Sequence, residues 1–236
     1  MIIPMSAQQW QTINKQRFEE LLAPTVAFFS SESFSFKLSY TSYLGHSSQK
    51  PFDTMTGFAF KDGKRHYYNM PGQLTLQNED MRILLDSAEK VIIAMDRDDK
   101  FENTANDFLY ETLFSADNTL EYASLPGGAG IIRIKFLNHL EYEMQETRIG
   151  QDGLVDSITL FYKNEIEEEV DGKPTGKVKP KMVCQFSEMI TGVSLPEKFN
   201  LEKVIVKEKK TIKAVGKYAD YELVDYRIDK PINRKN

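Results

Sequence analysis

The chain has 236 residues, of which 41% are hydrophobic and 28% charged, a balance typical of a globular protein and unlike that of a disordered one. Its net charge of −5 argues against a chain-wide nucleic-acid-binding surface. The segment from Glu197 to Asn236 holds 11 basic and 7 acidic residues, which is typical of a solvated surface, so no nucleic-acid partner is expected.

The first seven residues form a short apolar run with a proline and end in small residues. This pattern is similar to the end of a secretory signal peptide that is cleaved after Ala7, and an ordinary N-terminal extension is the alternative. We therefore predict a signal-peptide remnant over 1–7 and one domain over 8–236, since β-rich chains of this length often form a single domain. No stretch approaches the roughly 18 apolar residues that span a bilayer, so no transmembrane segment is expected.

The N-terminal third combines a helix pattern with strand patterns. Apolar spacing predicts a helix from Gln8 to Ala23, with Pro24 ending it. From Ser33 to Thr41 the apolar period changes to two, which predicts a half-buried strand. A second strand over 54–60 leads into the Asp62-Gly63 pair, which favours a tight hairpin.

Short strands with turn residues between them predict an antiparallel meander over 65–70, 73–77, 81–86 and 90–95. A second helix is predicted from Thr104 to Phe114, with Asn103 or Thr104 as its cap. The glycine-rich stretch from Leu125 to Gly130 lacks the spacing of a phosphate-binding loop and is expected to be a loop or bulge.

A second meander follows in the C-terminal half. The acidic run 165–171 and the basic run 173–181 predict a solvated hairpin tip, charged against edge aggregation. Strands are expected at 131–137, 139–149, 154–163, 181–187, 203–206 and 221–228.

Residues that carry catalysis or bind metals form no recognisable group. The one cysteine, Cys184, lies in an apolar strand pattern, and none of the three histidines belongs to a known catalytic or metal-binding spacing. We predict no disulfide, no metal site, no cofactor and no enzymatic activity. A hydrolase that uses two of the 35 acidic residues would need both of them in one cleft, which the sequence does not show.

Aromatic residues are abundant, with 15 Phe and 11 Tyr, many of them on strand faces. Such side chains can fill a core. They can instead line an apolar cavity where a strongly curved sheet cannot fill itself.

The order of elements resembles the LolA/LolB-like superfamily of lipoprotein carriers over about residues 8–206. The similar features are an N-terminal helix, a long strand, the run Gly57 to Phe60 before a Lys-Asp-Gly-Lys turn and an aromatic strand, then short strands, a helix and a strand pair across Asp152-Gly153. The resemblance implies an α+β fold, in which an antiparallel, strongly curved sheet forms an incomplete half-barrel covered by an N-terminal and a mid-chain helix. The charged hairpin over 165–181 and the last strand depart from the family pattern.

The resemblance also implies a non-catalytic, monomeric protein, periplasmic or otherwise exported, that binds a lipid or the acyl chain of a lipoprotein in the half-barrel cavity. Acyl burial suits such a wall, because each buried methylene contributes about 0.8 kcal/mol. The alternative is an envelope interaction module with a filled core, which docks to a protein partner through a sheet edge or the charged hairpin. Strand alternation and the assumed inward face predict these cavity-lining residues: Phe36, Leu38, Tyr40, Phe58, Phe60, Ile132, Ile134, Phe136, Tyr142, Ile158 and Leu160.

Overall fold

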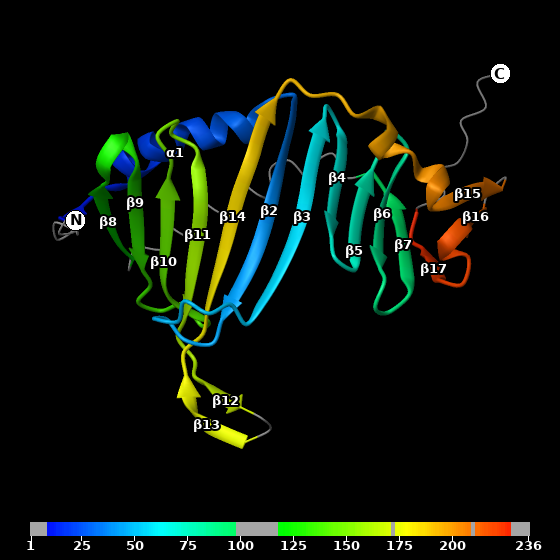
Figure 1. Cartoon of the computed structure of the whole chain (residues 1–236). Helices are drawn as coiled ribbons and strands as arrows, with labels where there is room; N and C mark the ends of the chain where they lie inside the picture. Colours follow the sequence, from blue (N-terminus) through cyan, green and yellow to red (C-terminus); the bar gives the residue numbers. More distant parts are fainter. Residues whose placement is uncertain (1–8, 98–117, 171–172, 209–210, 228–236) are drawn as a thin grey trace, which may run out of the picture. The chain divides into compact units, whose positions relative to one another are not determined.

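The computed structural model describes residues 9–97, 118–170, 173–208 and 211–227 (Figure 1). The predicted signal-peptide remnant over 1–7 and the predicted helix over 104–114 lie outside the described residues. The chain divides into two compact units. Unit 1 comprises Met1–Ser31, Lys37–Thr56 and Asn103–Met189, and unit 2 comprises Glu32–Phe36, Gly57–Glu102 and Ile190–Asn236. The expectation of one domain over 8–236 stays a prediction.

Most described residues belong to strands, and thirteen of these strands hydrogen bond in one sheet in the order β1-β8-β9-β10-β11-β14-β2-β3-β4-β5-β6-β7-β17. The order ends at β1 and β17, so the sheet does not close on itself. Strand β17 (Glu222–Asp225) runs parallel to β7 (Val91–Asp96), with Leu223 opposite Ile92, so the sheet is mixed.

The predicted fold class, an antiparallel half-barrel covered by two helices, is therefore wrong. Alternation along a strand predicts that the strand exists but not which strand it pairs with or in which direction. The long connection between β7 and β17 brings the chain back in the same direction, as parallel pairing requires. Only one α-helix is present among the described residues.

Unit 1 contains that helix and the strands around it. Its elements are β1 (Gln11–Thr12), α1 (Lys15–Ser30), β8 (Thr119–Ser124), the 3₁₀ turn η1 (Pro126–Gly128), β9 (Gly130–Lys135), β10 (Tyr142–Ile149), β11 (Val155–Tyr162), β12 (Ile166–Val170) and β13 (Lys173–Val178). The strands β2 (Ser33–Tyr43), β3 (Asp53–Asp62) and β14 (Lys181–Thr191) contribute residues to both units.

Helix α1 begins and ends later than predicted. Asn14 caps its start, because the Asn14 Oδ1 accepts a hydrogen bond from the Arg17 N–H at 2.8 Å. Pro24 lies inside the helix instead of ending it. Contacts distant in sequence outweigh the lost helical hydrogen bond: the Pro24 ring lies against Gly153, and the Thr25 hydroxyl accepts from the Val155 N–H at 3.0 Å.

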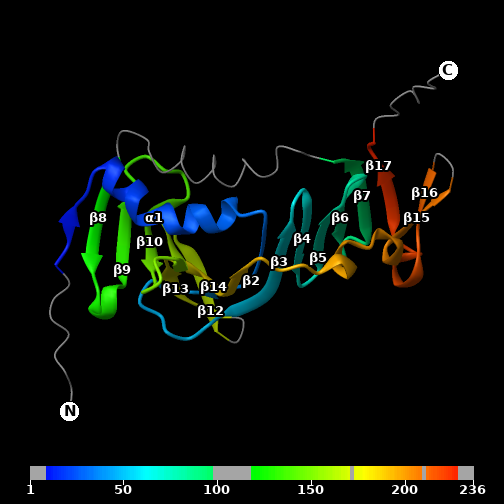
Figure 2. The same cartoon turned by 90° about the horizontal axis from the view of Figure 1, so that it is seen from above.

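Helix α1 lies along one face of the unit 1 strands (Figure 2), and the core of unit 1 lies between them. Phe18 on α1 is only 1% exposed. It belongs to a cluster with Leu120, Ile132, Ile134 and Ile149. The apolar face of the helix and the strands β8, β9 and β10 therefore bury one another.

Unit 2 contains the short-strand meander and the C-terminal segment. Its further elements are β4 (Arg65–Met70), β5 (Gln73–Gln77), β6 (Met81–Asp86), the 3₁₀ turns η2 (Pro196–Phe199), η3 (Leu201–Lys203) and η4 (Gly216–Tyr218), β15 (Ile205–Glu208) and β16 (Thr211–Ala214). Side chains of β5, β6 and β7 pack against this C-terminal segment, with Ile83 and Ile92 fully buried beside Leu201, Val204 and Ile205.

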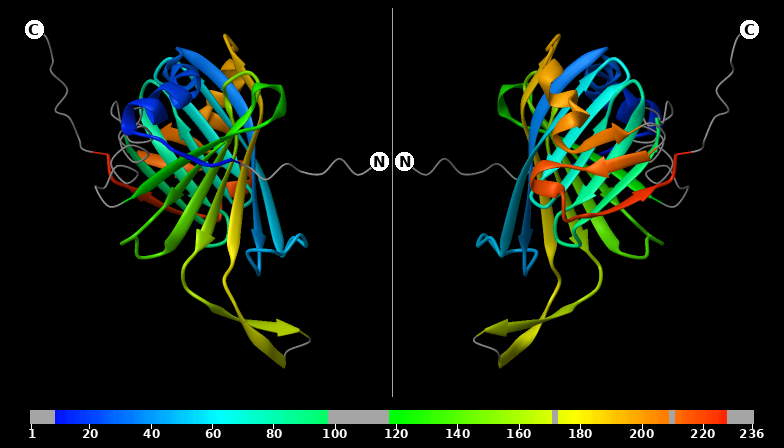
Figure 3. Two further views of the ribbon diagram at one scale, coloured as in Figure 1. Left: turned by 90° about the vertical axis from the view of Figure 1, so that its left-hand side faces the viewer. Right: turned by 90° about the vertical axis from the view of Figure 1, so that its right-hand side faces the viewer.

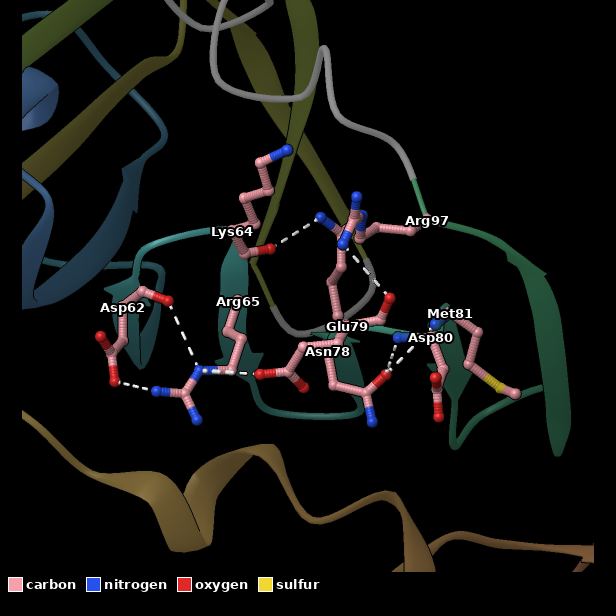
Figure 4. A network of polar contacts seen from close by, with 9 residues as sticks. Asp62, Lys64, Arg65, Asn78, Glu79, Asp80, Met81 and Arg97 are labelled. Carbon is pink, nitrogen blue, oxygen red and sulfur yellow. Dashed lines mark hydrogen bonds and ion pairs between the residues drawn. The ribbon is translucent and has the colours of Figure 1, made fainter.

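Polar contacts fix the turns of the meander (Figure 4). The Arg65 guanidinium donates to the Asp62 carboxylate, lies 3.6 Å from a Glu79 carboxylate oxygen and stacks 4.8 Å from the Phe199 ring centroid. The Asn78 side-chain oxygen accepts from the N–H groups of Asp80 and Met81. This network joins three segments of unit 2 and is structural.

The hairpin β12–β13 forms a separate two-stranded sheet and extends from the strand ends, as Figure 3 shows. Ile166 pairs with Val178 and Val170 with Lys173. The predicted hairpin over the acidic and basic runs is thus present, and both of its arms are paired strands.

Candidate functional site

The candidate site is the face of the unit 1 sheet against which α1 packs, here named the α1 face. Strand register defines it, because directly paired residues of antiparallel strands point to the same side. One row runs Ile132, Thr147, Ile158, Cys184 across β9, β10, β11 and β14, and the next runs Ile134, Gln145, Leu160, Met182. Both rows start beneath α1, because Ile132 and Ile134 pack against Phe18.

Beyond the helix contacts, the same face carries apolar side chains that are only half-buried. Ile132 and Ile134 are fully buried, whereas Ile158, Leu160 and Met182 are intermediate in exposure. Tyr40 shares this face because its side chain hydrogen bonds to Cys184. The α1 face therefore changes from covered at β9 to partly open at β11 and β14.

Two polar side chains lie buried in the middle of the α1 face. The Gln145 amide donates to the Thr147 hydroxyl at 3.0 Å, and the two residues are 8% and 4% exposed. Since buried polar groups need partners, this bond lets two polar side chains lie in an apolar surface at little cost.

A ladder of four aromatic rings occupies the end of β10 and β11 nearest the β9–β10 connection. The ring centroids of Phe136 and His139 lie 5.1 Å apart, those of His139 and Tyr142 4.9 Å, and those of Tyr142 and Tyr162 5.0 Å. The His139 Nδ1 accepts from the backbone N–H groups of Glu141 and Tyr142. Burial raises the pKa of Tyr142 to about 12, and Tyr162 adds to the rise. Ring contacts and the two hydrogen bonds to His139 therefore hold these side chains in place.

The connection between β2 and β3 is fixed at the same end of unit 1 by His46. Its Nε2 lies 3.1 Å from the Tyr162 carbonyl oxygen and its Nδ1 3.5 Å from a Glu143 carboxylate oxygen. Lys179 bonds the other Glu143 oxygen, and Lys181 donates to the His46 carbonyl at 2.8 Å. No hydroxyl or thiol nucleophile belongs to these contacts, and across the described ranges no three His, Cys, Asp or Glu residues group as metal ligands.

The structure brings the predicted cavity residues of unit 1 together on one face. Tyr40, Ile158 and Leu160 lie on its partly open side, and Ile132 and Ile134 on its covered side. Phe136 packs beside the Phe18 cluster, and the Tyr142 ring lies against Tyr162. Leu38, two residues before Tyr40 on β2, shares its side and is 3% exposed.

The predicted residues of unit 2 do not share one face. Phe60 stacks on Phe199 with centroids 5.1 Å apart, and Phe58 lies 6.4 Å from the Tyr67 ring. Phe36 stacks on Phe34, whose ring lies 5.8 Å from the Lys61 ammonium group. Because Lys61 and Phe60 are neighbours on one strand, their side chains point to opposite sides, so Phe36 is separated from Phe60. Alternation within β3 could not show which side of the sheet its aromatic residues take.

Two hollows lie elsewhere, and none of the eleven predicted residues lines them. One, of about 290 Å³, lies in unit 2 over β5, β6 and β7, and its lining includes Thr75, Leu84 and Ile93. The other, of about 600 Å³, lies in unit 1 between η1 and the β10–β11 turn.

No helix in the described part of the chain has the length and apolar character needed to cross a membrane.

Solved structures similar to this chain include the following two. An uncharacterized conserved protein from Thermus thermophilus aligns with 11% identity over 89% of this chain and 99% of that chain, at a TM-score of 0.45. A DUF1329 family protein from Desulfovibrio piger aligns with 14% identity over 79% of this chain and 97% of that chain, at a TM-score of 0.36. No family model and no curated protein sequence matches the chain. TM-scores below 0.5 do not establish a shared fold, so the LolA/LolB-like resemblance stays a prediction.

Proposed function

We propose that the protein is a non-catalytic binding protein of the bacterial envelope, which holds the acyl chain of a lipid or lipoprotein on the partly open side of the α1 face. The observation that carries this proposal is the register of two adjacent rows. These rows place Ile158, Leu160 and Met182 side by side on one face, each of them half-buried. Export to the periplasm and a monomeric state are parts of the same proposal.

An acyl chain suits this surface because it needs apolar area and no specific polar partner. Each methylene buried against the rows contributes about 0.8 kcal/mol, so a long chain gains binding free energy from contact alone. The polar groups within the face, Gln145 and Thr147, already bond each other. A hydrocarbon therefore leaves no new polar group unpaired there.

Binding without covalent chemistry fits the role of the polar groups nearby. His46 fixes the β2–β3 connection, and His139 accepts two backbone N–H groups. Both imidazoles thus act in the structure itself. The proposed ligand would be held and released unchanged.

The test is uptake of a fluorescent fatty acid by the full chain, compared between two variants of the same strand. Leu160→Asp places a charge on the α1 face, and binding should fall by at least about tenfold because a carboxylate cannot be buried against hydrocarbon. The matched control is Ser157→Asp, which lies on the opposite side of β11 and pairs with Arg148 and Gln185. Equal loss in both variants, or no uptake by the unchanged chain, would refute the proposal.

The β12–β13 hairpin supports a second candidate, a docking module for an envelope protein. It is a separate two-stranded sheet whose start carries an exposed apolar residue, Ile166 at 41% exposure, beside charged neighbours. Replacing residues 166–178 by a short glycine-serine turn should abolish capture of a protein partner and leave fatty-acid uptake unchanged. Unchanged capture of the protein partner would contradict the docking candidate.

A further inference from the structure

A hollow of unit 1 lies between two turns and plays no part in the proposed acyl binding. Its walls are η1 on one side and the turn that follows Ile149 on the other. Each turn is closed by its own backbone: Leu125 N–H donates to the Ala129 carbonyl, and Gly150 N–H to the Leu154 carbonyl, both at 2.8 Å. The hollow is therefore held by hydrogen-bonded turns rather than by free loops.

Two glycines make room for polar side chains at this hollow. Gly127 has φ of +78°, and a Cβ built on it would lie 2.3 Å from the Gln151 side-chain nitrogen. A Cβ on Gly150 would lie 2.8 Å from an Asp156 carboxylate oxygen. Both contacts are closer than side-chain carbons tolerate, so glycine at these positions lets Gln151 and Asp156 lie against the turns.

The hollow combines an apolar wall with two opposite charges. Leu125, Pro126, Ala129 and Ile131 form the apolar part of its wall. The whole hollow has a volume of about 600 Å³, which is in the range of small-molecule sites. The Arg148 Nε lies 3.9 Å from an Asp156 oxygen, and the two side chains are 57% and 52% exposed. Within the described ranges neither side chain makes another hydrogen bond or ion pair.

The charge pair is loose, so both partners keep bonding capacity. A guanidinium has five N–H donors in a planar fork, and a carboxylate accepts several hydrogen bonds. A purely anionic ligand at Arg148 would be repelled by Asp156, and a purely cationic ligand at Asp156 by Arg148. A ligand that carries both charges satisfies both groups.

We propose that this hollow binds a small zwitterion with an aliphatic part, such as a free amino acid. Its carboxylate lies on the Arg148 guanidinium, its ammonium group on the Asp156 carboxylate, and its aliphatic side chain on Leu125 and Ile131. The Gln151 amide borders the same space. Ile131 and Arg148 pair directly, and neither belongs to the rows that form the α1 face, so this site is separate from the acyl-binding surface.

The test is an NMR titration of the full ¹⁵N-labelled chain with L-leucine. We expect shifts of the amide signals of Gly127, Gly128 and Gly150, and about tenfold weaker binding after Arg148→Gln or Asp156→Asn. N-acetylleucine and leucinamide each lack one charge and should also bind about tenfold more weakly. The matched control is Lys207→Gln, which removes an exposed ion pair with Asp80 in unit 2 and should leave binding unchanged.

Three results would overturn the proposal: no amide shifts at millimolar leucine, equal binding of N-acetylleucine, or unchanged affinity in both variants. If Arg148→Gln does not fold, Arg148→Lys keeps the charge but loses the fork, and it should still weaken leucine binding. Fatty-acid uptake should be unaffected by the Arg148 and Asp156 variants. The two binding proposals can therefore fail independently.

Discussion

Ile158 of β11 lies directly opposite Cys184 of β14, which places the single thiol of the chain on the α1 face. Cys184 is 9% exposed and hydrogen bonds to Tyr40. Burial raises the pKa of the Cys184 thiol from 9.0 to about 11. The thiol therefore reports on the packing of the face that we propose as the binding surface.

Alkylation of Cys184 should be slow in the folded chain at pH 9 and fast in the denatured chain, because the thiolate is the reactive form. A raised folded pKa means that its contribution to stability is fully present below pH 9 and is lost as pH rises through about 11. Mass spectrometry after iodoacetamide treatment in buffer and in urea measures both rates. Equal rates at pH 9 would contradict the burial of this thiol.

Phe18→Ala should lower the free energy of unfolding by about 3–5 kcal/mol, because it removes a fully buried ring from the contact between α1 and the sheet. The control is Glu19→Ala on the exposed side of the same helix, expected to change stability by no more than about 0.5 kcal/mol. Urea denaturation followed by circular dichroism measures both. A Phe18→Ala chain as stable as the unchanged one would mean that α1 does not pack as described.

Gly57→Ala should be strongly destabilising although Gly57 has an ordinary backbone conformation. An added Cβ would lie 2.5 Å from the Asn69 carbonyl oxygen, and a backbone atom cannot move away without disturbing the β3–β4 pair. Gly45→Ala is the control, since its nearest neighbour would be 3.8 Å away. Thermal unfolding should show a clearly lower melting temperature for Gly57→Ala only, and equal temperatures would argue against this register.

Asn14→Ala should lower the unfolding free energy by about 1 kcal/mol, because the Arg17 N–H loses its cap. Gln16→Ala, two residues further on and outside the cap, should have a smaller effect. Asn14→Asp should keep most of the stability, since a carboxylate also accepts the hydrogen bond. If Asn14→Ala leaves the unfolding free energy unchanged, Asn14 is not the residue that caps the start of the helix.

Local signals in the sequence predicted the meander well. The strands β4, β5 and β6 have the predicted bounds, because Asp62-Gly63 and Pro71-Gly72 mark the turns and the apolar residues alternate between them. Gly63 and Gly72 both have positive φ, as such turns require. Here neighbouring residues decide the structure.

Distant contacts decide the features that sequence reasoning missed. The start of α1 depends on Asn14 as a cap, a signal that was present in the sequence, whereas its continuation past Pro24 depends on Gly153 and Val155. The short strand β16 has little apolar alternation and pairs with β15. The parallel pairing of β17 with β7 has no local signature at all.

The candidate site shows the same division. Alternation correctly grouped Ile158 with Leu160 and Ile132 with Ile134 within their strands, and the observed register then joined both strands on one face. Phe60 could not be assigned in this way, because its side of the sheet is set by Phe199, far away in the sequence. The hollow between η1 and the β10–β11 turn could not be predicted from the sequence, apart from the glycines at its turns. Arg148 and Asp156 come together there only through the pairing of β10 with β11.

The measurement that tests the central claim most directly is native mass spectrometry of the gently purified full chain, followed by organic extraction and identification of bound lipid. The account predicts a stoichiometric lipid or acyl species on the unchanged chain and on Ser157→Asp, and its loss from Leu160→Asp. A chain that carries no lipid and takes up no fluorescent fatty acid, or a Leu160→Asp chain that retains its lipid, would contradict acyl binding on the α1 face.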